Sequence, residues 1–406
     1  MKMTYNPNMT AGSSALALQL PMDENFAKQQ EFFDLCKDDA SMFIKSEAEF
    51  IAFLGERERN ARWVDDVSVR GLRVLLLDEV IFLDVGKLRD TIVADTSKNT
   101  GLVLQGGSIA QTAIRTCAIP TLLDRAKISG TALSKVATSV LRDIINECLK
   151  VAATNANAKI RIADGKISSV MSNSYVALPM PDIFTMVSKK IRRRFTTAEF
   201  LGGSWDHTYT IGEWKLSGER GLIKKYAEKL DAHGVDYDKV QPAIRVSSSD
   251  VGKSAVNIVP KLIYGKDQLL LPIGGSIGVE HEGKSTMENV EENMDGVYSL
   301  YNERLQKLAN LLEVEINHPY DCMGGILKKM QVPMKYANPA LESFGAGFGE
   351  YDGCTAHDIF FGLGELIMQL QIDGIKGSQV LKYEEQISKV LSWNFKDFDI
   401  KGGAKR

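Results

Sequence analysis

Two alternating apolar segments, separated by a short polar stretch, limit the possible folds of this chain more than any other part of its sequence. Together they read IRVSSSDVGKSAVNIVPKLIYG, residues 244–265. The alternation places Val256, Ile258 and Leu262 on one face, which is the pattern of a strand with one buried side. Pro260 is tolerated on an edge strand but is unfavourable inside a helix. The segment therefore predicts an antiparallel strand pair.

The same segment contains Gly252-Lys253-Ser254, which match the last three residues of the Walker A phosphate-binding loop. That loop has the pattern G-x-x-x-x-G-K-[ST] and lies between a strand and a helix, so that backbone N–H groups face the phosphates. Ser247 occupies the position of the first glycine, and a strand pattern follows where a helix is required. We therefore expect no nucleotide here. The expected elements are strands Ala243–Ser248 and Ser254–Tyr264, joined by a turn at Ser249-Asp250-Val251-Gly252.

The other patterns predict an α+β fold. Asp164-Gly165 lies between alternating apolar residues and is a strong hairpin signal. Thr286–Leu312 predicts a long helix with acidic residues in its first turns, where the helix dipole favours them. We expect an antiparallel sheet of hairpins packed on this long helix, with helical N- and C-terminal regions.

A second helix is predicted at Thr131–Ala153 by its apolar spacing. Its expected apolar face consists of Leu133, Val136, Val140, Ile144, Cys148 and Val151. The regions of the chain that we expect are a flexible arm at 1–22, a mixed helical region at 23–130, a central α+β domain at 131–315 and a mostly helical region at 316–406.

Composition and charge exclude several classes of protein. The 406 residues carry a formal net charge of −3, so a wholly basic nucleic-acid coat is excluded, although a local basic surface is not. The five cysteines and five histidines are scattered and form no paired metal-ligand motif. No apolar run approaches the roughly 18 residues that span a bilayer. We therefore expect a cytoplasmic protein without a metal, a cofactor or a membrane partner.

The dense basic run KKIRRR, residues 189–194, is the clearest candidate for a binding surface. Arginine binds phosphates in a bidentate manner, and each neutralised phosphate releases counterions. Aromatic side chains beside such charges can stack on unpaired bases. A solvated helix face explains the run equally well, and both interpretations stay open here. The candidate binding residues are Lys189, Lys190, Arg192, Arg193, Arg194, Arg245, Lys253 and Lys261, and the candidate stacking residues are Phe195, Trp205, Tyr209 and Trp214.

Four segments within residues 130–375 are similar to a known family. They read GKISSVMSNSYVALPMPDIFTMV, QPAIRVSSSDVGKSAVNIVPKLIYG, GVEHEGK and TAHDIFFGLGEL. They resemble the phage- and plasmid-encoded family known as domain of unknown function 932. The family's Arg-x-x-Cys-x-Asn-Gly after the hairpin is missing, since Tyr264-Gly265-Lys266-Asp267 stands in its place. The element order is also similar to that of RecT/Redβ-type annealing proteins, which implies a basic groove for single-stranded DNA and assembly into rings or filaments without ATP.

These observations predict a single-stranded DNA-binding and annealing protein of a phage or plasmid recombination system. We expect it to form homo-oligomers. Two alternatives stay open: a non-enzymatic interaction protein, and a Mg²⁺-dependent nuclease using Asp267 and the triplet Glu282-Gly283-Lys284. A catalytic role for Cys322 beside His318 is not favoured, because Pro319 between them disrupts regular helical geometry.

Overall fold

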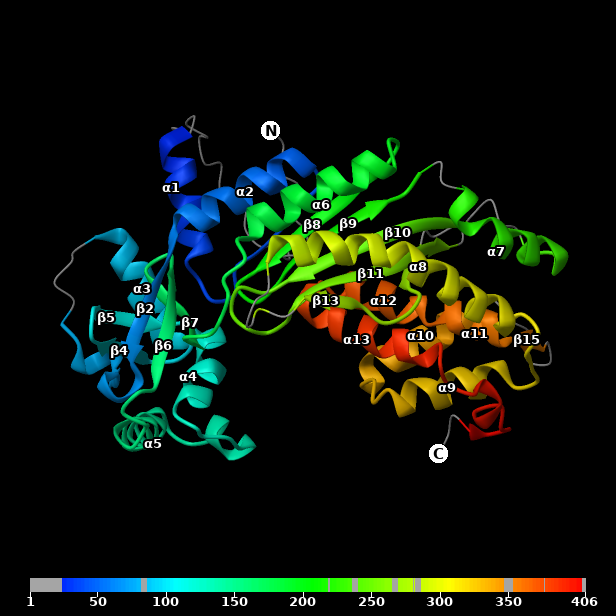
Figure 1. Ribbon diagram of the computed structural model, residues 1–406. Helices are drawn as coiled ribbons and strands as arrows, with labels where there is room; N and C mark the ends of the chain where they lie inside the picture. Colours follow the sequence, from blue (N-terminus) through cyan, green and yellow to red (C-terminus); the bar gives the residue numbers. More distant parts are fainter. Residues whose placement is uncertain are drawn as a thin grey trace, which may run out of the picture.

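The computed structural model describes residues 24–81, 86–217, 220–235, 240–264, 269–279, 281, 286–346, 353–375 and 377–403. Its elements form two lobes, each built around its own β-sheet (Figure 1). The combination of helices with largely antiparallel sheets confirms the prediction of a mixed fold. The expected arm at 1–22 lies outside the described residues. Among the helices described, none is long and apolar enough to cross a membrane.

The larger sheet contains the predicted strand pair. β10 (Gln241–Ser248) and β11 (Val256–Tyr264) are antiparallel, and Ile244 lies opposite Pro260. This confirms the pairing, although β11 begins two residues later than expected. Gly252 in the connecting turn has a φ of +70°, a conformation that glycine adopts without a steric penalty. The Gly-Lys-Ser triplet therefore leads into a strand, which is not the strand–loop–helix arrangement of a phosphate loop.

Five further strands complete this sheet, in the order β1-β8-β9-β10-β11-β12, with β13 also paired to β11. Pro260 lies between the stretch of β11 that pairs with β13 and the stretch that pairs with β12. Its missing N–H therefore removes no hydrogen bond from either ladder. The bounds are β1 (Ser41–Ile44), β8 (Glu199–Asp206), β9 (Thr210–Lys215), β12 (Leu269–Pro272) and β13 (Ile277–Val279).

Helices cover both faces of the larger sheet (Figure 1). Two neighbouring residues of β9 point to opposite faces: Gly212 faces Phe184 of α6, and Ile211 faces Gly377 of α13. One face is covered by α2 (Glu47–Arg59), α6 (Met180–Arg194) and α8 (Met287–Leu311), and the other by α12 (Gly364–Ile372) and α13 (Gly377–Val390). α8 matches the predicted long helix to within one residue at each end, and Thr286 caps it.

The remaining elements of the larger lobe extend its core towards the C-terminus. α7 packs against α8 and β10, while α9, α10 and α11 lie beside α12 and the end of α8. β14 and β15 form a two-stranded sheet of their own. The bounds are α7 (Arg220–Ala232), α9 (Pro319–Lys329), α10 (Met334–Ala346), α11 (Ala356–Gly362), β14 (Glu315–Ile316) and β15 (Cys354–Thr355).

The smaller lobe has a six-stranded sheet in the order β2-β6-β7-β5-β4-β3, in which β5 and β7 are parallel. The turn between β6 and β7 is Asp164-Gly165, with φ values of +52° and +75°, and it confirms the predicted hairpin. The bounds are β2 (Ala61–Ser68), β3 (Arg73–Leu76), β4 (Leu102–Gly106), β5 (Ile109–Ile114), β6 (Asn157–Ala163), β7 (Lys166–Ser172), α1 (Glu24–Leu35), α3 (Lys87–Lys98), α4 (Ile119–Arg125) and α5 (Thr138–Lys150).

α5 corrects the helix predicted at 131–153. It begins at Thr138, because residues 131–134 form a separate 3₁₀ turn. Its packed stripe is Leu141, Ile145 and Leu149, at intervals of four residues. Part of the expected apolar face is exposed, namely Val136, Val140 and Val151. Two apolar stripes lie side by side on this helix, and the sequence does not show which one meets β3.

The chain passes between the lobes more than once. β1 belongs to the larger sheet, residues 61–172 supply the smaller sheet, and α6 returns the chain to the larger lobe. Two separate hydrophobic cores follow this division. The predicted boundaries at 130 and 315 do not coincide with it, since residue 130 lies among the elements of the smaller lobe and residue 315 among those of the larger lobe.

Candidate nucleic-acid surface and inter-lobe pocket

The basic run occupies the last turns of α6. Lys189 and Arg193 are exposed and have no hydrogen bond or ion pair to any described residue. They are four residues apart, so they are neighbours on one helix face, about 6 Å apart along the axis. These two cations are therefore available to an anionic partner.

The other members of the run interact within the protein. Lys190 pairs with Glu291 at 2.9 Å and with Asp295 at 3.3 Å, both on α8. Arg192 pairs with Glu47 at the start of α2. Arg194 is exposed, and its guanidinium carbon lies 5.8 Å from the Phe195 ring centroid. The basic run thus contacts α2 and α8 through Arg192 and Lys190, whereas Lys189 and Arg193 make no ion pair with a described residue.

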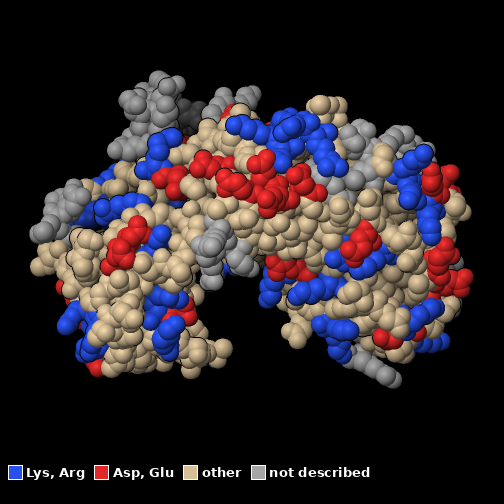
Figure 2. All heavy atoms as spheres, in the orientation of Figure 1, with Lys and Arg blue, Asp and Glu red and all other residues tan. Residues whose placement is uncertain are grey.

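Acidic residues border this surface. Figure 2 shows basic side chains over the end of α6, next to a band of acidic side chains over α8. The acidic residues of α8 in this band are Glu288, Glu291, Glu292 and Asp295. On this face the basic end of α6 is therefore bordered by negative charge.

The prediction that Arg245 and Lys261 contact DNA is wrong, because both are buried beneath α13. Lys261 Nζ lies 2.6 Å from Glu213 and 2.8 Å from Glu384, and Arg245 also pairs with Glu384. Burial lowers the pKa of Lys261 to about 8 and that of Arg245 to about 10. These cations hold α13 on the sheet and do not reach the surface.

The predicted stacking residues are also mostly buried. Trp205 is only 8% exposed and packs at 5.3 Å from Phe53 and 4.8 Å from His207, measured between ring centroids. Phe195 and Trp214 are buried in the same core. Tyr209 is half-buried, and its hydroxyl donates to the Lys253 carbonyl at 3.3 Å. Trp205 therefore cannot stack on a base without unfolding of its surroundings, and the expectation for it is wrong.

Lys253 is exposed in the turn between β10 and β11. This turn and the basic run lie near opposite ends of α6. Met180, at the first turn of α6, shares a pocket with Asp250 of the turn, whereas Lys189 lies nine residues further on, about 14 Å along the helix axis. The structure therefore does not bring Lys253 into the basic run.

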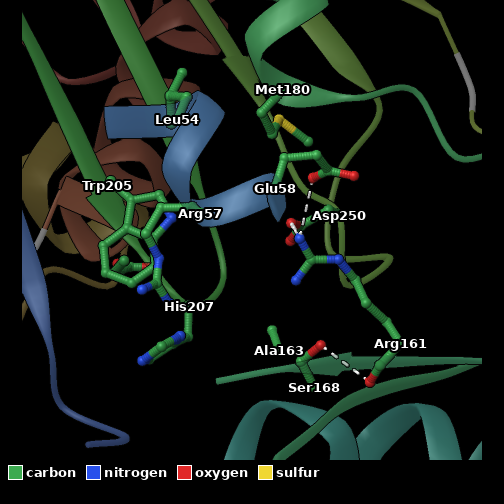
Figure 3. Close-up of a pocket in the computed structure, with 11 residues that line it drawn as sticks. Leu54, Arg57, Glu58, Arg161, Ala163, Ser168, Met180, Trp205, His207 and Asp250 are labelled. Carbon is green, nitrogen blue, oxygen red and sulfur yellow. Dashed lines mark hydrogen bonds and ion pairs between the residues drawn. The ribbon is translucent and has the colours of Figure 1, made fainter. Parts of the chain in front are cut away.

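A pocket lies between the two lobes, in a place that sequence reasoning did not identify (Figure 3). It is open to solvent, and its empty volume of about 400 Å³ includes part of that open space. Arg57 and Glu58 come from α2, Arg161 from β6 and Asp250 from the β10–β11 turn. Arg57, Trp205 and His207 lie on one side of the pocket, and Arg161 lies on the other (Figure 3).

Ion pairs at this pocket join the lobes. Nη2 of Arg161 lies 2.6 Å from Asp250 and 3.4 Å from Glu58. Nη2 of Arg57 pairs with Asp164, the first residue of the predicted hairpin turn. Burial, together with the charge of Arg115, lowers the pKa of Arg57 to about 10. Each pair joins a group of the larger lobe to a group of the smaller one.

A second layer of buried charge lies behind the pocket. Nη1 of Arg115 is 2.7 Å from Nε2 of His207 and 3.4 Å from Asp38. Lys166 Nζ is 2.9 Å from Asp38 and also pairs with Asp95. Burial and the charge of Arg115 hold the pKa of His207 well below its usual range, so this imidazole is neutral at neutral pH. The layer is a largely buried ionic network, in which the Asp95 side chain stays 12% exposed.

The remaining sequence hypotheses concern cysteine and metal chemistry. Cys322 is fully buried in the larger core, and burial raises the pKa of its thiol to about 12. All five cysteines lie in described segments and all are free thiols. Asp267 and Glu282-Gly283-Lys284, proposed for a nuclease site, lie outside the described residues. No group of three or more His, Cys, Asp or Glu side chains in the described segments could hold a metal ion.

Comparison with known proteins gives no relative: no protein-family model, no curated protein and no solved structure matches this chain.

Proposed function

We propose that this chain binds single-stranded DNA through the exposed end of α6 and promotes annealing without a nucleotide. The observation that supports binding is the pair of exposed cations, Lys189 and Arg193, for which no described residue provides a partner. Unpaired cations lose little on binding a phosphate, because no internal ion pair has to be broken first. Arg194 lies beside them. Arg192 already pairs with Glu47, so it could contact a phosphate only while that carboxylate competes for it.

The wider part of the proposal rests on sequence resemblance. The four segments similar to domain of unknown function 932 support a phage or plasmid origin and a cytoplasmic site of action in the host cell. The similarity in element order to RecT/Redβ-type proteins supports annealing by a homo-oligomer, with a sheet of hairpins against the long helix α8 as its structural unit. Lys253 and Tyr209 form a second, separate contact region in this proposal, at the other end of the larger sheet.

Binding is tested by removing the two unpaired cations. Each phosphate contact to a single strand contributes roughly 0.7 to the slope of log affinity against log salt, so Lys189→Ala/Arg193→Ala should lower the slope by about 1.4. We also expect affinity to fall roughly tenfold at low salt, because two charge-assisted contacts are lost. The measurement is fluorescence anisotropy of a labelled oligothymidine, titrated with the full chain at two salt concentrations.

The matched control is Lys135→Ala/Lys328→Ala, which removes the same charge from exposed positions elsewhere. It should leave affinity and salt slope close to wild type. Equal behaviour of the two double variants would show that binding reflects net charge alone and would reject the site. Complementary-strand annealing without ATP, followed by fluorescence quenching, tests the second half of the proposal with the same proteins.

A further inference from the structure

The pocket between the lobes is lined by two arginines, Arg57 and Arg161, and by the carboxylates of Glu58, Asp206 and Asp250. We propose that it binds a phosphate group between the guanidinium groups of Arg57 and Arg161. This site is separate from the proposed DNA surface, which lies towards the other end of α6. A phosphate group can be free inorganic phosphate or the terminal phosphate of a nucleic-acid strand, and both present the same oxygens to the two arginines.

Ion pairs hold both guanidinium groups in place, but several of their N–H groups donate no hydrogen bond to a described residue. Arg57 is 7% exposed and Arg161 is 6% exposed. In each of them Nη2 makes the ion pairs, and Nε has no hydrogen-bond partner in the described segments. Nη1 of each likewise has no hydrogen bond to a described residue. Nη1 of each arginine is therefore the donor that an anion in the pocket could use.

The two arginines suit a tetrahedral anion in particular. They line opposite sides of the pocket, so one ligand can accept hydrogen bonds from both at once (Figure 3). The planar fork of a guanidinium group matches phosphate oxygens in a bidentate manner. Arg57 also lies 4.8 Å from the centre of the Trp205 ring, which fixes the orientation of its fork. A single planar carboxylate could not accept two hydrogen bonds from both guanidinium groups at once.

Carboxylates of the pocket determine how tightly an anion is held. Asp206 accepts the backbone N–H groups of Thr208 at 2.7 Å and Tyr209 at 2.9 Å, which disperse its charge. Glu58 and Asp250 both pair with Arg161 and therefore compete with an incoming anion. We expect modest affinity in the wild type and tighter binding when one competitor is neutralised.

The test uses isothermal titration calorimetry of the full chain with inorganic phosphate, with chloride adjusted to hold ionic strength constant. Wild type should bind one phosphate saturably. Arg161→Gln should weaken binding roughly tenfold or more, since it removes one charged fork. Asp250→Asn should strengthen binding several-fold, because it removes a competing charge. A gain of affinity cannot result from misfolding. Lys328→Gln, at an exposed position outside both proposed sites, should leave phosphate binding unchanged.

Two results would overturn the site: wild type without saturable phosphate binding, or Asp250→Asn no tighter than wild type. Oligonucleotides with a 5′-phosphate or a 5′-hydroxyl then identify the source. A preference for the phosphorylated strand that Arg161→Gln abolishes assigns the site to a strand terminus, and equal affinity for the two strands assigns it to free phosphate. Failure here leaves binding through Lys189 and Arg193 untouched, so the two proposals stand or fall separately.

Discussion

Glu384 on α13 balances two buried cations from neighbouring strands. It pairs with Arg245 of β10 and Lys261 of β11, and all three side chains are at most 6% exposed. Glu384→Gln should destabilise the protein by about 3–5 kcal/mol, because it leaves buried positive charge uncompensated. The measurement is the free energy of unfolding in urea. Glu385→Gln changes the adjacent, exposed carboxylate and should cost less than about 0.5 kcal/mol; similar losses in both variants would contradict the burial of this network.

Two buried histidines make stability depend on pH. Burial, with Arg115 for His207, lowers the pKa of His207 far below 6.5, and burial lowers the pKa of His357 to about 4. Both take up a proton near pH 6.5 only when the chain is unfolded. The unfolded state therefore binds more protons, and stability falls as pH drops below 6.5, by up to about 1.4 kcal/mol per pH unit for each histidine.

This pH dependence is measured as the free energy of unfolding at pH 7.5, 6.5 and 5.5. His357→Gln should lower the slope of the free energy of unfolding against pH by the contribution of one titrating proton, whatever the variant's absolute stability. The substitution also removes the hydrogen bond between His357 and the Tyr226 hydroxyl, at 2.5 Å, which lowers stability at every pH. The pH dependence of stability, and not stability itself, is therefore the quantity to compare. A slope identical to that of wild type would mean that His357 is already protonated in the folded protein.

At the level of elements, glycines decide how closely α2 approaches the larger sheet. Gly203 of β8 lies directly under the Phe50 ring of α2, and a Cβ atom there would meet that ring. Gly203→Ala should cost about 1–3 kcal/mol, as overpacking of a closed core does, and should displace the helix that carries Arg57 and Glu58. Thermal unfolding measures the loss. Gly275→Ala is the control, since open space surrounds that position, and an equal loss there would exclude a packing cause.

Elements with local signals were predictable from the sequence. The β10–β11 pair, the Asp164-Gly165 hairpin and the long helix α8 follow from alternation, a turn dipeptide and an acidic first turn, all of which act within a few residues. The exposure of Lys189 and Arg193 follows from their density in one run. α5 was only partly predictable, because its packed stripe depends on β3, which is distant in the sequence.

The pocket residues were not predictable because their partners are remote. Arg161 resembles an ordinary solvent-facing residue between Ile160 and Ile162, yet it meets Asp250, 89 residues later. Lys261 alternates with apolar neighbours in the same manner, and its partner Glu384 lies on α13. Alternation shows which residues share a face, but it does not show whether that face meets water or a carboxylate from another element.

At the level of the whole molecule, the buried ion pairs between the lobes should make unfolding cooperative. Unfolding of one lobe alone would remove the partners of Arg161 and Asp164 and the packing around them, so each lobe stabilises the other. Differential scanning calorimetry of the wild type should show one transition, with equal calorimetric and van't Hoff enthalpies. Two resolved transitions would show instead that the two cores are independent.

The pairing of β1 with β8 also has a consequence for synthesis on the ribosome. Ser41 lies opposite Asp206, so β1 gains its partner only after 165 further residues have been translated. At about 5–20 residues per second this takes roughly 8–33 s, during which an apolar strand with Phe43 at its centre remains unpaired. The nascent chain therefore presents a binding site for general chaperones early in translation, and ribosome-associated trapping factors should crosslink near residue 43 until residue 206 emerges.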